Sequence, residues 1–474
     1  MTTQAVTTAP KILIIIVTWN NKASVLELLA SLATIAYPID ALDILVVDNA
    51  SQDGTKEAIK TAYPQINLIY NQENLGGTGG FNTGLQWGFE QTEGRYQYFW
   101  LLDNDVLVHH RALTELVALL EAKPDIAVAG STMMQLDYPW RINEMGAFID
   151  RKVNIGHLIL FRHLETIQAW QGYSAPELLT IKADLSQHLM HCQPYMDVEY
   201  VAAASLLIRV KVAKEAGLWR DYFIHFDDVE WCLRIAEMGY RIVVSAQSLI
   251  WHLSAAAKVP TWVLYYDNRN VLDLLSNHGA DQTTLRHFKL YILKKAVYYH
   301  LIGKPDLAQL HYDAVNDFEA GRFGKKNIQL NSTYQPNDAV SSVLLDKTVK
   351  KILVSRTVNL QATRLQEPLV QAMLTRPELE IDCMPLLNGE TVYQLPRARF
   401  IKPFPPSKIK RWFTYWRLRG QYDLIIQSDY DASIGLSWLK ADLLYVNDEG
   451  FCRRSQPKWR DVVKAVYLFF RSFY

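Results

Sequence analysis

Three apolar segments, each followed by a stretch with helical spacing, constrain the fold of this chain more than any other feature. Residues 11–18 (KILIIIVT) and 43–48 (DILVVD) are typical of buried parallel strands, and residues 66–70 are a third candidate strand. Helices are expected over residues 22–33 and from about residue 56. This alternation predicts a doubly wound, mostly parallel α/β sheet, which binds ligands at the carboxyl ends of its strands.

Polar side chains lie at those predicted strand ends. Thr18 and Asp48 end the first two strands, and a later apolar run, YFWLLDNDVLV, is interrupted by Asp103, Asn104 and Asp105. In an extended backbone, residues i and i+2 point to the same side, so Asp103 and Asp105 are expected to face one hard cation together. The alternative is a strand that ends in an ordinary acidic turn, because a DxD triplet alone is too short to identify a site.

A glycine-rich segment, NLGGTGGFNTG, occupies residues 74–84. It fits the dinucleotide fingerprint only loosely, and it follows the third strand rather than the first. We expect its glycines to let the backbone approach a sugar nucleotide and to precede a helix over residues 81–90. A flexible loop is the alternative.

A second acidic cluster, FIHFDDVEWCLR, begins at residue 223, after a helix predicted over 110–122 and strands predicted over 126–131 and 198–208. Asp227 and Asp228 lie near the start of an amphipathic helix, where the helix dipole favours carboxylates. One acid can hold an acceptor while the other removes a proton; the alternative is that Asp227 only caps the helix.

Other parts of this region give weaker signals. A strand predicted over 241–245 leads to His252. A lone histidine is more often packed or solvated than a ligand, but the position of His252 one strand after the acidic helix makes it a candidate ligand. Residues 135–195 show little periodicity and are expected to form an irregular segment on the acceptor side.

Composition excludes several classes of protein. Lys+Arg 49 balance Asp+Glu 49, so the net charge does not indicate nucleic-acid binding. The N-terminus has no basic signal-peptide region, and no segment reaches the roughly 18 uninterrupted apolar residues that a membrane-spanning helix needs. We expect a cytoplasmic protein that lies on a membrane at most, with reduced cysteines because no metal or redox spacing occurs among Cys192, Cys232, Cys383 and Cys452.

Together these parts resemble the inverting family 2 glycosyltransferases of the GT-A fold, over roughly residues 10–325. No single motif is convincing, whereas six in the right order are. The motifs are IVTWNN at 16–21, VVDNASQDGT at 46–55, NLGGTGG at 74–80, LLDNDV at 101–106, FDDVEWCLR at 226–234 and IWH at 250–252.

The resemblance implies a role for each polar residue. Asp103 and Asp105 would hold Mn²⁺ or Mg²⁺ on the donor diphosphate, with His252 as a third ligand. Asp228 would be the catalytic base, with Asp227 beside it. The residues implied at the nucleotide sugar, with Thr18 and Asp48 at its base and ribose, are Thr18, Asn20, Asp48, Asn74, Gly76, Gly77, Asp103 and Asn104.

The chemistry of glycosyl transfer requires such a set of groups independently. Displacement of a nucleoside diphosphate builds negative charge on the leaving phosphate, which a divalent cation stabilises. The attacking hydroxyl needs a carboxylate to accept its proton. A single displacement inverts the anomeric carbon and needs one base, unlike the paired carboxylates of a glycosidase.

Within the family, the acidic cluster, IWH and YYDNRN at 265–270 look most like the galactofuranosyltransferase branch. UDP-galactofuranose is therefore the expected donor. dTDP-rhamnose is the alternative, although the rhamnosyltransferase branch usually has Glu-Asp where Asp227 stands here. Trp251, Tyr266 and Arg269 are acceptor-side candidates, and the alternative for the last two is packing at the start of a helix.

The remaining chain is less informative. Residues 281–325 are helical, basic and aromatic, which suits either an anionic membrane surface carrying a lipid-linked acceptor or a helix pair packed on the catalytic domain. Residues 326–348 are expected to form a linker. Residues 349–474 are expected to form a second, Rossmann-like α/β domain. This domain has no recognisable catalytic motif, and the chain is compatible with a piece of a longer protein. The domain's segment RWFTYWRLR at 411–419 suits docking to a membrane or partner, or packing at an interface within the domain.

The sequence thus predicts a catalytic domain over residues 10–280, which extends a lipid-linked glycan at the inner face of the cell membrane. A non-catalytic sugar-nucleotide sensor or scaffold is the alternative of another class, but a dead relative usually lacks at least one of the metal ligands or the base. A nucleotidyltransferase would need a basic loop after the first strand, where only Lys22 occurs. The oligomeric state is left open.

Overall fold

The computed structural model describes two compact units. The first comprises the chain up to Ser254 together with Arg269–Phe288 and Gly321–Lys326, and the second comprises the rest. This division runs through the predicted helical extension instead of along its ends. The described residues are 9–473 except 150, 152–157, 161–165, 190–192, 254–261, 302–303, 329–338, 356–364, 385–394, 396, 402–406, 428–441, 447–449 and 454–458.

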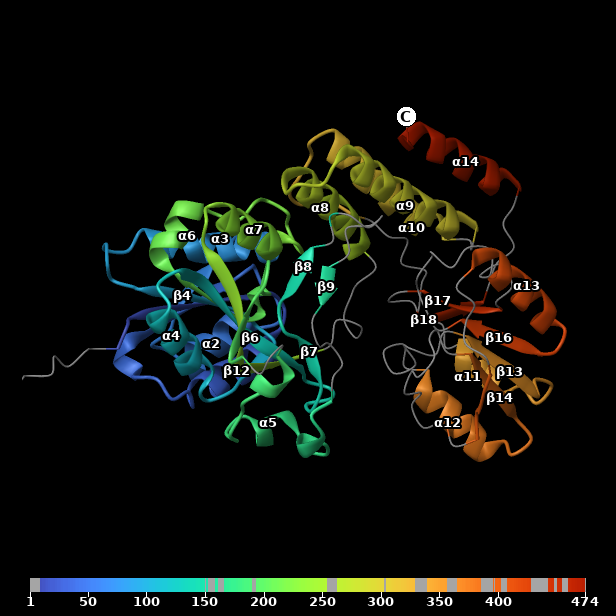
Figure 1. Cartoon of the computed structure of the whole chain (residues 1–474), viewed down its shortest axis with the longest axis horizontal. Coiled ribbons are helices and arrows are strands. Elements are labelled where there is room, and N and C mark those ends of the chain that lie inside the picture. The colour runs from blue at the N-terminus through green and yellow to red at the C-terminus, as the bar shows by residue number, and fades with distance from the viewer. Residues whose placement is uncertain are drawn as a thin grey trace, which may run out of the picture. The chain divides into compact units, whose positions relative to one another are not determined.

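The first unit is built on a mostly parallel sheet with the strand order β10-β12-β6-β11-β4-β1-β2-β3, so the predicted fold class is confirmed (Figure 1). The antiparallel strand β11 is inserted between β4 and β6. The strands are β1 (Ile12–Thr18), β2 (Leu42–Asp48), β3 (Asn67–Tyr70), β4 (Tyr98–Asp103), β6 (Ile126–Gln135), β10 (Tyr195–Asp197), β11 (Leu206–Arg209) and β12 (Arg241–His252), with β5 (Val106–Val108) paired to β12 and β7 (Ile142–Glu144) paired to β6.

Helices cover both faces of this sheet (Figure 1). Ile12, Ile14 and Ile16 of β1 share one hydrophobic core with the helices on one face, and the side chains between them face the other layer. Burial on both faces explains why β1 reads as a continuous apolar run. The first layer is α1 (Lys22–Leu32), α2 (Thr55–Ala62) and α4 (Ala112–Ala122), and the other is α3 (Gly76–Phe89), α6 (Val210–Ala216) and α7 (Asp227–Glu237).

The predicted start of helix α3 at residue 81 is wrong, because the helix begins at Gly76 and includes most of the glycine-rich segment. Gly80, Gly84 and Gly88 recur at a spacing of four and face the sheet. A Cβ atom at these positions would overlap with side chains of β1 and β4. Close packing of helix on sheet therefore outweighs the low helix propensity of glycine.

Two strand predictions also need correction. The strand expected over 198–208 begins only at Leu206, because Ala203–Ser205 form a 3-10 turn. The strand expected over 241–245 continues to His252, with an irregularity between Ser245 and Leu249. The less periodic region after β6 contains the short elements β7, β8 (Ala147–Ile149), β9 (Leu158–Leu160) and α5 (Ala175–Leu178).

The second unit contains a second α/β sheet, as predicted, with the order β15-β14-β13-β16-β17-β18. Its first five strands are parallel, and β18 pairs antiparallel with β17. The strands are β13 (Lys351–Ser355), β14 (Glu380–Met384), β15 (Arg399–Phe400), β16 (Leu424–Gln427), β17 (Leu443–Val446) and β18 (Gly450–Arg453), and the helices are α11 (Ala339–Leu345), α12 (Gln366–Thr375), α13 (Lys408–Arg419) and α14 (Trp459–Phe473).

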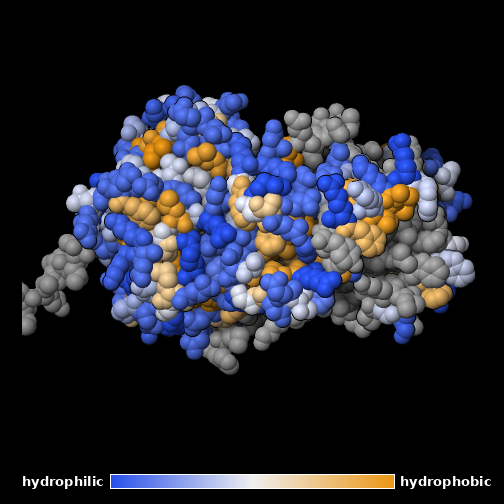
Figure 2. All heavy atoms as spheres, turned by 90° about the horizontal axis from the view of Figure 1, so that it is seen from above, coloured by the Kyte–Doolittle hydropathy of each residue, from blue (hydrophilic) through white to orange (hydrophobic). Residues whose placement is uncertain are grey.

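Three longer helices lie between the sheets in the chain: α8 (Val263–Asn277), α9 (Gln282–Leu301) and α10 (Pro305–Glu319). The aromatic side chains Tyr298 and Tyr299 of α9 are buried, and Tyr299 contacts the His311 ring of α10. The two helices therefore pack against each other at these side chains. Among the described helices, none combines the length and apolar character required to span a membrane, and the face in Figure 2 is largely hydrophilic with small apolar patches.

Candidate functional site

Strand pairing brings the three predicted metal ligands together. Asp103 ends β4, Asp105 precedes β5, and His252 ends β12. Because β5 pairs antiparallel to β12 with Val106 opposite His252, Asp105 lies beside the imidazole. His252 Nε2 is 3.1 Å from Asp105 Oδ1 and 3.9 Å from Asp103 Oδ2.

The donor set fits a divalent cation. One ligand atom from each of Asp103, Asp105 and His252 lies within 4.8 Å of the others, and all three side chains are partly exposed. Two carboxylates and one imidazole suit Mn²⁺, and two carboxylates also suit Mg²⁺. An octahedral ion bound here would retain positions for phosphate oxygens and water.

The middle residue of the DND triplet has a different task. Asn104 Nδ2 donates a hydrogen bond to Thr18 Oγ1 at 3.0 Å, and Asn104 Oδ1 accepts one from Asn21 Nδ2 at 3.1 Å. Thr18 is buried. These bonds tie the end of β4 to the end of β1, so Thr18 and Asn104 shape the strand ends that carry the metal ligands.

Asp48, at the end of β2, is fully buried. Its Oδ1 accepts a hydrogen bond from the Ser51 backbone N–H at 2.8 Å, whereas its Oδ2 has no hydrogen-bond partner among the described residues. A buried carboxylate oxygen without a partner is unfavourable, but the fully buried Asp48 side chain offers no exposed surface to the ribose that was predicted to bind there. Asn20 instead organises the adjoining loop, because its Oδ1 accepts a hydrogen bond from the Gln52 N–H at 2.7 Å.

The glycine-rich helix α3 begins with a tight turn. Asn74 Oδ1 accepts a hydrogen bond from the Gly76 N–H at 2.8 Å. Gly76 has a φ of +73°, and a Cβ there would overlap with the Phe223 carbonyl oxygen. Gly77, in contrast, has open space where a Cβ would lie. Asn74 and Gly76 are thus structural in this turn, while the backbone at Gly77 is accessible to a ligand.

The two adjacent acids of α7 point in different directions. Asp227 is 6% exposed, and its Oδ2 accepts a hydrogen bond from Thr78 Oγ1 of α3 at 2.5 Å. Asp228 is partly exposed and accepts hydrogen bonds from the backbone N–H groups of Ala203, at 3.0 Å, and Val229, at 2.8 Å. Asp228 is therefore the acid of the pair that a substrate can reach.

Burial and mutual repulsion perturb these carboxyls. Burial, followed by the charge of Asp228, raises the pKa of Asp227 to about 6. Burial also raises the pKa of Asp228, against two hydrogen bonds from backbone N–H groups, and the charge of Asp103 raises it further. Asp228 thus interacts electrostatically with a predicted metal ligand, which links the acid pair to the triad.

Glu144, at the end of β7, is a member of this cluster that the sequence did not reveal. Burial, followed by the charge of Asp228, raises the pKa of Glu144 to about 7, while His252 lowers it. Its surroundings in the sequence have little periodicity and no motif, so only the pairing of β7 with β6 brings Glu144 to this edge of the sheet.

The three acceptor-side candidates are buried. Trp251 Nε1 donates a hydrogen bond to the Pro139 carbonyl at 2.9 Å, and the Tyr266 ring packs edge-on against Tyr265. Arg269 donates hydrogen bonds to backbone carbonyls. These contacts support the packing alternative for Tyr266 and Arg269, and they leave Trp251 without an exposed surface for an acceptor.

Comparison with known proteins agrees with this geometry. Residues 13–167 match the family model Glycosyl transferase family 2. The galactofuranosyltransferase GlfT2 of Mycobacterium tuberculosis is 26% identical over 258 residues, which cover 53% of this chain and 38% of that protein. The GlfT2 of Mycolicibacterium smegmatis is 23% identical over 268 residues, covering 55% and 40%. The chain therefore spans about two fifths of the length of these relatives.

Two further proteins are also similar to this chain. Glycosyltransferase AglE of Haloferax volcanii is 25% identical over 238 residues, covering 50% of this chain and 64% of AglE. The solved structure of Staphylococcus aureus TarS 1–349 has a TM-score of 0.40 and 15% identity, covering 65% of this chain and 80% of its own. Residues 13–167 thus match family 2 of the glycosyltransferases, and the mostly parallel sheet and the Asp-Asp-His triad at its edge agree with that match.

Proposed function

We propose that the chain is a metal-dependent inverting glycosyltransferase that transfers galactofuranose from UDP-galactofuranose to a glycan acceptor. The observation that carries this proposal is the Asp103–Asp105–His252 triad together with the partly exposed carboxylate of Asp228, whose pKa the charge of Asp103 raises. A metal-binding triad without a nearby base would suit a sensor equally well. The base makes group transfer the better explanation.

In the proposed reaction, Asp103, Asp105 and His252 would hold a divalent cation, which would stabilise the charge on the leaving diphosphate. Asp228 accepts the proton of the acceptor hydroxyl. The hydroxyl oxygen forms a bond to the anomeric carbon while the bond from that carbon to the phosphate oxygen breaks. Attack opposite the leaving group inverts the anomeric centre. Thr78 fixes Asp227 beside the base through the hydrogen bond between their side chains.

Donor preference rests on the similarity to two galactofuranosyltransferases and on the Asp227–Asp228 pair. We expect release of UDP from UDP-galactofuranose in the presence of Mn²⁺ and a glycan acceptor, with little release of dTDP from dTDP-rhamnose. Turnover should be lost on chelation and in Asp228→Ala. Turnover of dTDP-rhamnose alone would reassign the donor. Binding of both donors without turnover, even with a lipid-linked acceptor, would favour the sensor.

For the acceptor, we propose a lipid-linked glycan at the inner, anionic face of a membrane. Helix α14 supports this, because residues spaced by three, four and one along it expose an apolar stripe. Three basic residues, Arg460, Lys464 and Arg471, flank that stripe on one side. Such a helix suits the interface of a membrane with anionic headgroups. The stripe is formed by side chains between 47% and 79% exposed: Trp459, Val463, Val466, Tyr467 and Phe470.

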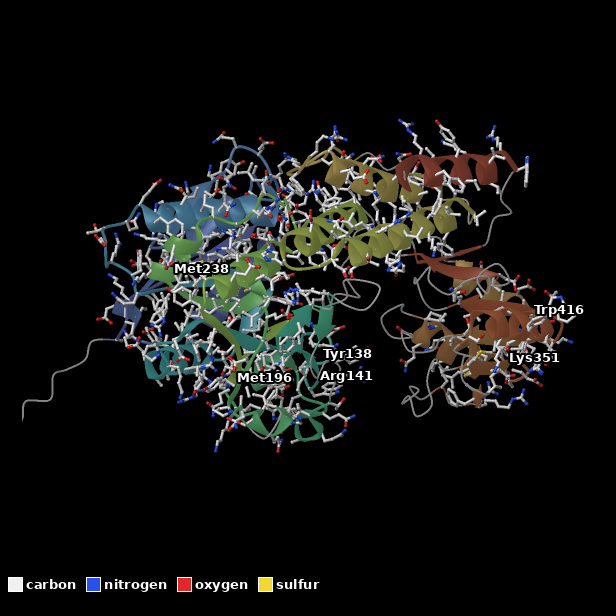
Figure 3. All side chains as sticks on the ribbon, turned by 45° about the horizontal axis from the view of Figure 1, so that its top comes forward. Tyr138, Arg141, Met196, Met238, Lys351 and Trp416 are labelled. Carbon is white, nitrogen blue, oxygen red and sulfur yellow. The ribbon has the colours of Figure 1, made fainter. Side chains whose placement is uncertain are left out.

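Helix α13 has the same composition on its surface. Phe413 and Trp416 are exposed, with Lys410 and Arg417 exposed nearby, and Figure 3 shows Trp416 at the outer side of the second unit. The exposed Phe413, Trp416 and Arg417 support docking for this part of the segment at 411–419.

Vesicle binding tests the α14 surface. The full chain is expected to sediment with vesicles that contain phosphatidylglycerol, and less with phosphatidylcholine alone or at high salt. The double variant Val463→Asp/Phe470→Asp should bind at least about tenfold more weakly, because two apolar side chains leave the interface. Leu374→Asp, which changes an exposed apolar residue of α12, is the matched control. Unchanged binding in the double variant would contradict the assignment, as would an effect on self-association only.

A further inference from the structure

The loop that leads into the acid pair has an unusual backbone. Phe223, His225 and Phe226 have φ values of 69°, 63° and 66°, in the left-handed region that residues with side chains rarely adopt. Phe226 directly precedes Asp227, the first residue of α7. The conformation of this loop therefore determines where Asp227 and Asp228 point. Strained residues of this kind persist only where the surrounding structure holds them.

One side chain of α8 binds most of the loop's carbonyl groups. Asn270 Nδ2 lies 3.3 Å from the Tyr222 carbonyl oxygen, 2.8 Å from that of Ile224 and 3.0 Å from that of His225. Asn270 is fully buried. Its amide therefore satisfies carbonyls that a loop of this shape cannot pair with its own N–H groups.

Arg269 orients that amide. Arg269 Nε donates a hydrogen bond to Asn270 Oδ1 at 2.9 Å, so the amide nitrogen must face the loop. The two other guanidinium nitrogens donate to the carbonyls of Tyr222 and Gly324, both at 2.9 Å. Gly324 N–H in turn donates to the Asp221 carbonyl at 2.9 Å, so Gly324 is tied both to Arg269 and to the residue that precedes the loop.

The opposite side of the loop contacts the glycine-rich helix α3. The Thr78 N–H donates to the Phe223 carbonyl at 3.2 Å, and the Thr78 hydroxyl donates to Asp227. A Cβ on Gly76 would overlap with the same Phe223 carbonyl. The loop is thus fixed between the helix expected at the donor and the Arg269–Asn270 pair.

We infer that Arg269 and Asn270 are positioning residues that hold the 222–226 loop and thereby aim Asp228 at the acceptor hydroxyl. This inference rests on the proposed function for the role of Asp228. Both side chains are almost completely buried, so neither contacts the acceptor. They act on catalysis through the loop.

Kinetics separate this role from general stabilisation. Asn270→Ala is expected to lower kcat about 100-fold, the loss typical of a catalytic group displaced by about 1 Å. The affinities for UDP and Mn²⁺ should change less than about twofold, because the residues predicted to bind them lie mainly at the ends of β1, β2, β4 and β12. Asn277→Ala is the matched control, since that exposed amide on the same helix bonds to no described residue other than Asp273, whose carbonyl lies in its own turn. Asn270→Ser, which keeps one donor, replaces the Ala variant if the latter does not fold.

A double-mutant cycle identifies the group through which Asn270 acts. In an Asp228→Asn background, Asn270→Ala should lower kcat by less than about a further twofold, because the base that Asn270 positions is already absent. A full 100-fold loss in that background, or an equal loss of UDP affinity, would overturn the inference.

Hydrogen exchange tests the loop without any need for activity. Peptides that cover residues 220–230 should exchange faster in Asn270→Ala than in wild type or Asn277→Ala, and peptides from β1 and β2 should not change. Unaltered exchange over 220–230 would show that Asn270 does not hold the loop. Faster exchange in a protein that turns over no sugar donor would instead support the role of Asn270 in holding the loop and refute the proposed function.

Discussion

Replacement of Asp228 by Asn is expected to lower kcat by roughly 10²–10⁴-fold, the contribution typical of general acid–base catalysis. The amide has the size of the carboxylate and retains one oxygen, which can still accept the hydrogen bond from the Ala203 N–H. It cannot accept a proton from the acceptor. Affinity for UDP should therefore persist while turnover disappears, as measured by calorimetry and by initial rates of UDP release. Asp40→Asn, at an exposed acid of the same unit, is the control.

The dependence on pH provides a second measurement of the same group. A base must be ionised to act, and burial raises the pKa of both Asp227, to about 6, and Asp228. Activity should therefore fall on acidification at a pH above the ordinary aspartate value of about 4, because Asp228 becomes protonated there. Thr78→Val removes a hydrogen bond that lowers the pKa of Asp227. The pKa of Asp227 should then rise further, and an acidic limb of activity near pH 4 in wild type would contradict the assignment.

Local sequence patterns predicted the strand ends well because the physics there is local. A β-branched run that is buried on both faces is typical of a parallel strand. Its last residue then lies at the carboxyl edge of the sheet, where ligands bind. This reasoning placed Asp48 and Asp103 at one edge of the same sheet. It could not orient single side chains. Asn104 turns toward Thr18, and Asp227 turns toward Thr78, because of partners that are distant in sequence.

Features set by tertiary contacts were not predictable in this way. The start of α3 depends on how closely a glycine face can approach β1, and helix propensity alone gave a start five residues too late. Glu144 reaches the site through the pairing of β7 with β6. The hydrogen bonds of Asn270 depend on a loop in which non-glycine residues adopt left-handed backbone conformations, and the sequence has no signal for such a loop. For the same reason, the sequence YYDNRN at 265–270 suggested that Tyr266 and Arg269 lie near the acceptor, whereas both side chains are buried.

Replacement of His252 by Ala is expected to weaken Mn²⁺ binding by at least about 10–100-fold, on the scale seen when even the supporting partners of a metal site are lost. The imidazole is one of three protein ligands, and its Nε2 lies 3.1 Å from Asp105 Oδ1. Asp105→Asn should weaken binding as well, because it removes a charge from the site. Turnover should fall at low Mn²⁺ and recover partly as Mn²⁺ is raised, since Asp228 is intact in these variants.

The recovery distinguishes a lost ligand from a damaged fold. A misfolded site would not regain turnover at any metal concentration, whereas a site with one ligand fewer needs only a higher occupancy. Mn²⁺ binding measured by electron paramagnetic resonance, without donor or acceptor, should show the same order of affinities as the rates. His287→Ala is the control, because that histidine is exposed and belongs to the same unit. Equal Mn²⁺ dependence in wild type and His252→Ala would remove the imidazole from the ligand set, leaving the two carboxylates as the protein's ligands.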